Sequence, residues 1–140
     1  ELIDKLETDR RVDSMVKESI KDALLDTAGL YTAPVKVVKA YLVTKEYSNY
    51  KDIAITFKNI SNKTIDAISF SWYGETAFHE PADMGTSIHE GFGGGFDDDA
   101  IGPGKTRTSQ WSILSNNAKK VILAWPTKVA FSDGTKWELR

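Results

Sequence analysis

The chain has 140 residues, which is enough for one domain that folds without disulfides or metal. Its 18 basic and 20 acidic residues leave it near neutral, which argues against the broad electrostatic binding that nucleic acid needs. It contains no cysteine, and this excludes a disulfide scaffold, a thiolate zinc site and a cysteine nucleophile. No run of about 18 apolar residues occurs, so we expect no membrane-spanning helix.

Residues 1–33 predict an N-terminal amphipathic helical segment. The first 30 residues contain no aromatic residue and no proline, and their apolar residues recur at intervals near three and four, the period of a helix. These apolar residues are Leu2, Leu6, Val12, Met15, Val16, Ile20, Ala23 and Leu24. Two interpretations are open: a helix that packs on the following domain, or a stalk or oligomerisation helix that separates this domain from a membrane anchor. Because the first residue is Glu rather than Met, we also expect a processed chain from which any signal peptide has been removed.

The central stretch Lys51–Tyr73 predicts two strands that fold back on each other as a hairpin. A cluster of turn-forming residues lies at 59–64. On each side of it, every second residue is apolar and the residues between are mostly polar, which is the pattern of a strand with one buried face. The residues expected to face the core are Ile53, Ile55 and Phe57 before the turn and Ile68, Phe70 and Trp72 after it.

Further strands are predicted along residues 34–140, and together they indicate an antiparallel β-sandwich. Asp133-Gly134 is a strong hairpin signal near the end of the chain, and Pro126 is expected to interrupt strand pairing. The predicted strands outside the central stretch are Val35–Thr44, Thr106–Leu114, Val121–Trp125, Val129–Phe131 and Lys136–Leu139.

Residues 74–104 form a long connection that holds 8 of the 10 glycines and both histidines. Compact domains rarely carry so long a connection without internal structure. We expect either short edge strands, around Thr76–Phe78 and Thr86–His89, or a functional loop. The run Gly93–Gly95 is too permissive in conformation to pack alone, so the phenylalanines Phe78, Phe92 and Phe96 are expected to anchor the loop.

The run Phe70-Ser71-Trp72-Tyr73-Gly74 resembles the Phe-x-Leu-Tyr-Asp pattern that names the FxLYD modules, with Trp72 in place of Leu and Gly74 in place of Asp. The preceding residues 57–65 are similar to the turn of those modules, and residues 101–106 resemble their entry to the next strand. The resemblance implies an immunoglobulin-like sandwich of the kind found in secreted and lipid-anchored bacterial proteins. It implies no catalytic residue. The predicted fold is therefore mainly β, an immunoglobulin-like antiparallel β-sandwich with an N-terminal helical segment.

Two groups of residues in the long connection have the chemistry of metal ligands. His79 and His89, with nearby loop carboxylates, can hold zinc or another transition metal, and the alternative is that they are solvated loop residues. Asp97, Asp98 and Asp99 offer hard oxygen ligands suited to calcium, and the alternative is a charged loop tip.

Aromatic residues are the other candidates for binding. Three tryptophans, at positions 72, 111 and 125, fall in register with apolar neighbours and are expected in the core. Tyrosines at 41, 47, 50 and 73 are expected to be exposed, which would suit a sugar-stacking platform. The binding residues predicted from sequence are Tyr47, Tyr50, Tyr73, His79, His89 and Phe92.

The function expected from these observations is a non-catalytic binding or accessory module of a bacterium, located outside the cytoplasm, with a lipid anchor upstream of Glu1. A protein or a glycan is expected as partner, with no cofactor and no nucleic acid, and the oligomeric state stays open. The alternative is a small carbohydrate-acting or metal-dependent enzyme domain that uses the 74–104 loop. A third interpretation is a structural spacer.

Overall fold

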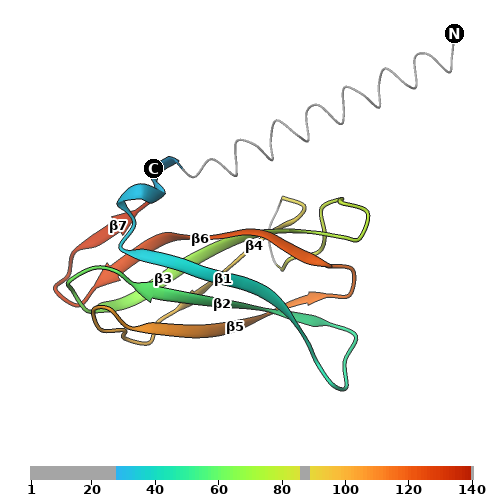
Figure 1. The fold of residues 1–140 in the computed structure, drawn as a ribbon, viewed down its shortest axis with the longest axis horizontal. Helices are drawn as coiled ribbons and strands as arrows, with labels where there is room; N and C mark the ends of the chain where they lie inside the picture. The colour runs from blue at the N-terminus through green and yellow to red at the C-terminus, as the bar shows by residue number, and fades with distance from the viewer. Residues whose placement is uncertain (1–27, 86–88, 140) are drawn as a thin grey trace, which may run out of the picture.

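The computed structural model describes residues 28–85 and 89–139, so the predicted N-terminal helix lies almost entirely outside the described residues. The described chain opens with a short 3-10 helix, η1 (Ala28–Thr32), and continues as seven strands (Figure 1). The strands are β1 (Val35–Thr44), β2 (Lys51–Asn59), β3 (Ile65–Glu75), β4 (Phe92–Asp97), β5 (Thr106–Ser115), β6 (Lys120–Phe131) and β7 (Lys136–Glu138).

The strands form two antiparallel sheets that pack face to face. Sheet A has the order β1-β2-β5, and sheet B has the order β4-β3-β6-β7. The first, second and fifth strands thus face the other four, which is an arrangement of the immunoglobulin-like sandwich. The structure confirms the fold class predicted from the sequence.

The core lies between the central strands of the two sheets. The six apolar side chains predicted to face the core are all at most 1% exposed, but burial does not alternate along β2, because Ala54 and Thr56 on its other face are buried as well. Phe57 of β2 packs on Phe70 of β3 with ring centroids 5.0 Å apart. Trp111 of β5 is half-buried and packs on Phe70 and Trp72 at the edge of the core.

The hairpin predicted for residues 51–73 is wrong, because β2 and β3 belong to different sheets. The turn between them carries the chain from sheet A to sheet B, so that the two strands face each other across the core instead of pairing. Asn59, which is fully buried, fixes this corner: its Nδ2 donates to the carbonyl oxygens of Lys63 (2.8 Å) and Ile101 (3.1 Å). Its Oδ1 accepts from the backbone N–H of Ser61 at 3.0 Å.

The glycine run, predicted to be unable to pack alone, forms half of edge strand β4. Large side chains and a carbonyl approach Gly93 and Gly95 too closely for a residue with a Cβ atom. A Cβ atom on Gly93 would collide with the carbonyl oxygen of Met84 and the indole of Trp72, and one on Gly95 would lie 2.7 Å from the Trp111 ring. The run therefore makes room for two tryptophans in the core.

The connection between β3 and β4 does not contain the strand predicted at Thr76–Phe78. It begins with a tight turn, in which the backbone N–H of Thr76 donates to Glu80 O at 2.8 Å and that of His79 to Thr76 O at 3.1 Å. The strand predicted at Thr86–His89 falls mostly on residues 86–88, which lie outside the described residues.

Strand β6 runs through Pro126, where an interruption was expected. The pairing with β3 shifts at this point, because Phe70 is opposite Pro126 and Ser69 is opposite Lys128, which leaves Thr127 as an extra residue. Strand β7 pairs only with Lys128–Ala130. The edge of β6 that faces β7 therefore needs no backbone N–H at Pro126. The predicted hairpin at Asp133-Gly134 is confirmed as the β6–β7 turn, with Gly134 at φ 87°.

Candidate functional site

Three connections lie at one end of the sandwich, on the right in Figure 1: residues 45–50, the described residues 76–85 and 89–91 of the β3–β4 connection, and residues 116–119. Hydrogen bonds join the third connection to the first residue of β2 and to the second connection. Lys51 Nζ donates to the carbonyl of Ala118, and the backbone N–H of Asp83 donates to Asn117 Oδ1 at 3.0 Å. We call this region the loop end, and it includes the adjoining residue Leu114.

The loop end exposes large apolar and aromatic side chains. Tyr47 is 93% exposed, Phe78 is 83% exposed, and Leu114 is 67% exposed. Tyr50 is 48% exposed at the base of the first connection. The predicted exposure of Tyr47 and Tyr50 is confirmed, whereas Phe78 does not anchor its loop as expected.

Leu114 is held outward by a bulge in β5. Lys51 is opposite Ser115 and Asp52 is opposite Ser112, so Ile113 and Leu114 are extra residues on β5. Ile113 turns into the core, and Leu114 adopts φ 52°, a conformation that non-glycine residues rarely take. The sequence carries no local signal for this bulge, because it depends on the register with β2.

Both histidines lie on the β3–β4 connection. His79 is exposed in the tight turn at φ 60°, and His89 is partly exposed near the end of the connection, where its carbonyl accepts from Phe92 N at 3.2 Å. Across residues 28–85 and 89–139, no three His, Cys, Asp or Glu side chains come together in a group that could hold a metal ion. The described residues therefore do not support the transition-metal site predicted at His79 and His89.

Tyr73, predicted to be exposed, is buried at 1% exposure on the outer face of sheet B. Its ring packs on Phe92, with centroids 4.8 Å apart, and Phe92 packs edge-on against Trp125 at 6.4 Å. The β3–β4 connection covers this cluster, since a Cβ on Gly91 would collide with the Tyr73 ring. Burial leaves Tyr73 and Phe92 no surface for the binding role predicted from sequence.

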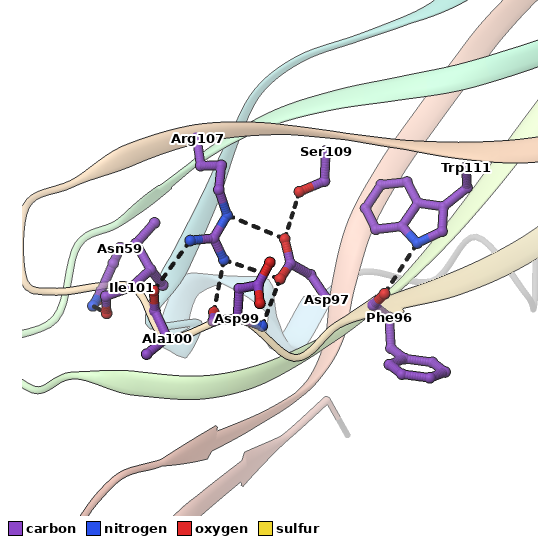
Figure 2. A network of polar contacts seen from close by, with 9 residues as sticks. All are labelled: Asn59, Phe96, Asp97, Asp99, Ala100, Ile101, Arg107, Ser109 and Trp111. Atoms are coloured by element: carbon purple, nitrogen blue, oxygen red, sulfur yellow. Dashed lines mark hydrogen bonds and ion pairs between the residues drawn. The ribbon is translucent and has the colours of Figure 1, made fainter.

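Asp97 lies at the opposite end of β4 from the histidines and joins the two sheets (Figure 2). Arg107 of β5 reaches it with two nitrogens, Nε to Oδ2 at 3.2 Å and Nη2 to Oδ1 at 3.0 Å. Ser109 Oγ donates to Oδ2, and the backbone N–H of Asp99 donates to Oδ1 at 2.9 Å. The same edge is closed by Trp111, whose Nε1 donates to Phe96 O at 3.0 Å.

The surroundings of Asp97 favour its ionised form. Burial alone would raise its pKa, but the hydrogen bonds from Ser109, Asp99 and Arg107 and the charge of Arg107 lower the pKa below its ordinary value. Arg107 also donates to the carbonyls of Asp99 (2.7 Å) and Ala100 (3.1 Å), so it fixes the loop in which Asp98 and Asp99 are exposed. Asp97, which was predicted to be a calcium ligand, thus forms an ion pair with Arg107.

A second buried carboxylate, Asp52, lies on the outer face of sheet A. Burial alone would raise its pKa, but Gln110 Nε2 donates to Oδ2 at 2.7 Å and Lys45 Nζ lies 2.9 Å from Oδ1, and together they lower the pKa below its ordinary value. This contact ties the start of the β1–β2 connection to sheet A.

A cavity of about 380 Å³ lies at the seam between β1 and β6. Its lining is mainly apolar, and it includes Leu30, Val35, Val37, Leu123 and Trp125. The cavity adjoins η1, which places it beside the first described residues and away from the loop end.

Comparison with known proteins adds evidence on the fold. No protein-family model and no curated protein matches the sequence. A crystal structure of a hypothetical protein from Peptoclostridium difficile 630 is similar to this chain, with a TM-score of 0.57 and 10% sequence identity. The similarity covers 76% of this chain and 87% of that one. In the described part of the chain, no helix is long and apolar enough to cross a membrane.

Proposed function

We propose that this domain is a non-catalytic binding module, located outside the cytoplasm, which contacts a partner protein through the loop end. One observation carries the proposal: Tyr47 and Phe78, on two separate connections, and Leu114, beside the third, have exposed side chains, and the three connections lie at the same end of the sandwich. Loops on a rigid scaffold are frequent binding sites, and exposed aromatic residues are enriched among the residues that dominate interface energies.

The chemistry of the loop end favours a protein over a glycan. Leu114 and Phe78 offer apolar surface without a hydrogen-bonding group, which suits the core of a protein interface.

Two further observations support the proposal, the first for a non-catalytic role and the second for a location outside the cytoplasm. Asp52 and Asp97, the buried carboxylates of the described chain, are both engaged by neighbouring side chains in contacts that hold strands or sheets together. The resemblance of residues 57–74 to the FxLYD modules supports a secreted or lipid-anchored bacterial protein.

The proposal is tested by capture from an extract of the source organism, with a pair of matched variants. The double variant Tyr47→Ser/Phe78→Ser removes two exposed aromatic residues from the loop end. The control Tyr31→Ser/Phe96→Ser removes one exposed Tyr and one exposed Phe elsewhere, since these residues are 89% and 69% exposed.

We expect the loop-end variant to lose about tenfold or more of the affinity for any captured protein, because interface anchors contribute about 2 kcal/mol or more each. The control variant should bind as the unchanged protein does, and all three proteins should melt at similar temperatures. Equal binding by the loop-end variant and the unchanged protein would refute the proposal.

A further inference from the structure

The outer face of sheet A presents side chains in cross-strand rows that the register defines. Residues of β1, β2 and β5 that lie opposite one another point to the same side of the sheet. The first two rows are Lys36, Lys58 and Thr106, followed by Lys39, Thr56 and Thr108. The next row contains Tyr41, Ala54 and Gln110.

Three exposed lysines stand close together in these rows. Lys36 and Lys58 are directly opposite each other, and Lys39 is in the adjacent row. Like charges directly opposite each other in an antiparallel pair destabilise the sheet. No acidic residue occurs in the three rows, and among the described ion pairs none involves these lysines.

Protection of a sheet edge does not account for this arrangement. Lysines on edge strands do prevent unwanted strand pairing, and β1 is an edge strand. Lys58, however, lies on β2, the central strand of sheet A, where the neighbouring strands already cover both sides. The position of Lys58 therefore has no explanation within the sheet itself.

Hydroxyl groups surround the lysines. Thr106 and Thr108 are exposed beside them, and the hydroxyls of Thr56 and Thr108 are 2.7 Å apart. Lys39 Nζ lies 5.3 Å from the centre of the Tyr41 ring, and this ring is 42% exposed. We call this surface, made of Lys36, Lys39, Tyr41, Lys58, Thr106 and Thr108, the lysine face.

We propose that the lysine face binds a strand of acidic polysaccharide, whose carboxylates pair with the three lysines. An anionic chain laid across the rows relieves the repulsion between Lys36 and Lys58, and the threonine hydroxyls beside them can donate to and accept from sugar hydroxyls. This surface is distinct from the loop end, so the inference does not depend on the proposed protein partner.

The composition of the face favours a glycan among the anionic polymers. Proteins that bind single-stranded nucleic acid stack bases on several aromatic residues, and this face has only Tyr41, which already lies under Lys39. Binding to an anionic lipid surface relies on larger basic clusters or on inserted apolar side chains. Threonines next to lysines match a polymer that carries both hydroxyls and carboxylates.

The test measures binding of the full chain to polygalacturonate by titration calorimetry, at low and at physiological ionic strength. The face variant is Lys36→Gln/Lys39→Gln/Lys58→Gln. The control is Lys119→Gln/Lys120→Gln/Lys136→Gln, which removes three exposed lysines elsewhere and changes the net charge equally. Dextran, duplex DNA, poly-glutamate and vesicles with phosphatidylglycerol are titrated in parallel.

We expect the face variant to bind polygalacturonate about tenfold or more weakly than the control, and binding to weaken as salt screens the charges. The melting temperature of the face variant should equal or exceed that of the unchanged protein, because the Lys36–Lys58 repulsion is gone. Equal losses in the two variants, no binding to polygalacturonate, or tighter binding to DNA, poly-glutamate or vesicles would each overturn the proposal.

Discussion

At the scale of single residues, Asp97 joins the two sheets at their β4–β5 edge. It accepts two hydrogen bonds from Arg107 and one from Ser109, both on the facing sheet, and its own exposure is 8%. Hydrogen bonds to charged groups are stronger than neutral ones, and an arginine left without its buried partner is costly.

The variant Asp97→Asn should therefore lower the free energy of unfolding by about 2–4 kcal/mol, because Arg107 loses its counter-charge. Urea denaturation at neutral pH measures this loss. Asp98→Asn makes the same chemical change one residue later, at an exposed carboxylate, and should cost under about 0.5 kcal/mol. Equal effects of the two substitutions would show that the Asp97–Arg107 contact does not stabilise the fold.

The lowered pKa of Asp97 also predicts how stability depends on pH. Its pKa is below the ordinary value of 3.8 in the folded state, so the unfolded chain binds the proton more tightly. The stabilisation by Asp97 is thus complete above the unfolded pKa and is lost as pH falls through the folded pKa. Urea denaturation across this range should show the gap between the unchanged protein and Asp97→Asn closing at acid pH. A gap that stays constant would contradict this assignment.

Sequence could not predict the role of Asp97, because its partner comes from the other sheet. Asp97-Asp98-Asp99 is an acidic run in a glycine-rich stretch, which is typical of a charged loop or a calcium site. Arg107 follows ten residues later, and only the fold places it opposite Asp97. By contrast, the turn chemistry of Asn59 and Ser61 was predictable, since it depends on neighbours in the chain.

At the scale of elements, strand β4 is shaped by the side chains that it covers. Gly95 leaves no room for a Cβ, which would lie 2.7 Å from two atoms of the Trp111 ring. The variant Gly95→Ala should therefore destabilise the domain by about 1–3 kcal/mol, because overpacking displaces the indole. Chemical denaturation measures the loss, and near-ultraviolet circular dichroism reports the change around tryptophan.

The control for this prediction is Gly102→Ala, whose added Cβ would meet only Lys105 Cγ at 3.8 Å, an ordinary contact. This variant should be neutral or should stabilise slightly, because alanine restricts the unfolded chain. If Gly95→Ala proved as stable as Gly102→Ala, the close packing of β4 on Trp111 would be wrong.

The alternation of residues in the sequence predicted where the strands lie better than it predicted which strands pair. Alternation along residues 53–57 and 68–72 identifies two strands with one buried face each, and it looks the same whether they pair in one sheet or face each other across a core. The structure places Phe57 and Phe70 face to face across the core. The close packing of the glycine run was harder to predict, because the two indoles that require glycine there come from other parts of the chain.

At the scale of the whole molecule, the surfaces divide by chemistry. The loop end exposes apolar and aromatic residues, and the outer face of sheet A carries the lysine face. On the outer face of sheet B, Tyr73, Phe92 and Trp125 form a buried cluster. Of the residues predicted for binding, Tyr47, Tyr50, His79 and His89 lie at the loop end. Leu114 is exposed beside them because of a bulge in β5 that could not be predicted from the sequence.

The loop end is tested most directly by site-specific photo-crosslinking in the source organism. A photoreactive phenylalanine analogue replaces Tyr47 or Phe78 at the loop end, or Tyr31 or Phe96 elsewhere, so that every probe sits at an aromatic position that is at least 69% exposed. We expect probes at 47 and 78 to cross-link the same protein, and probes at 31 and 96 not to cross-link it. Cross-links to a common protein from 31 and 96, with none from 47 and 78, would contradict this expectation.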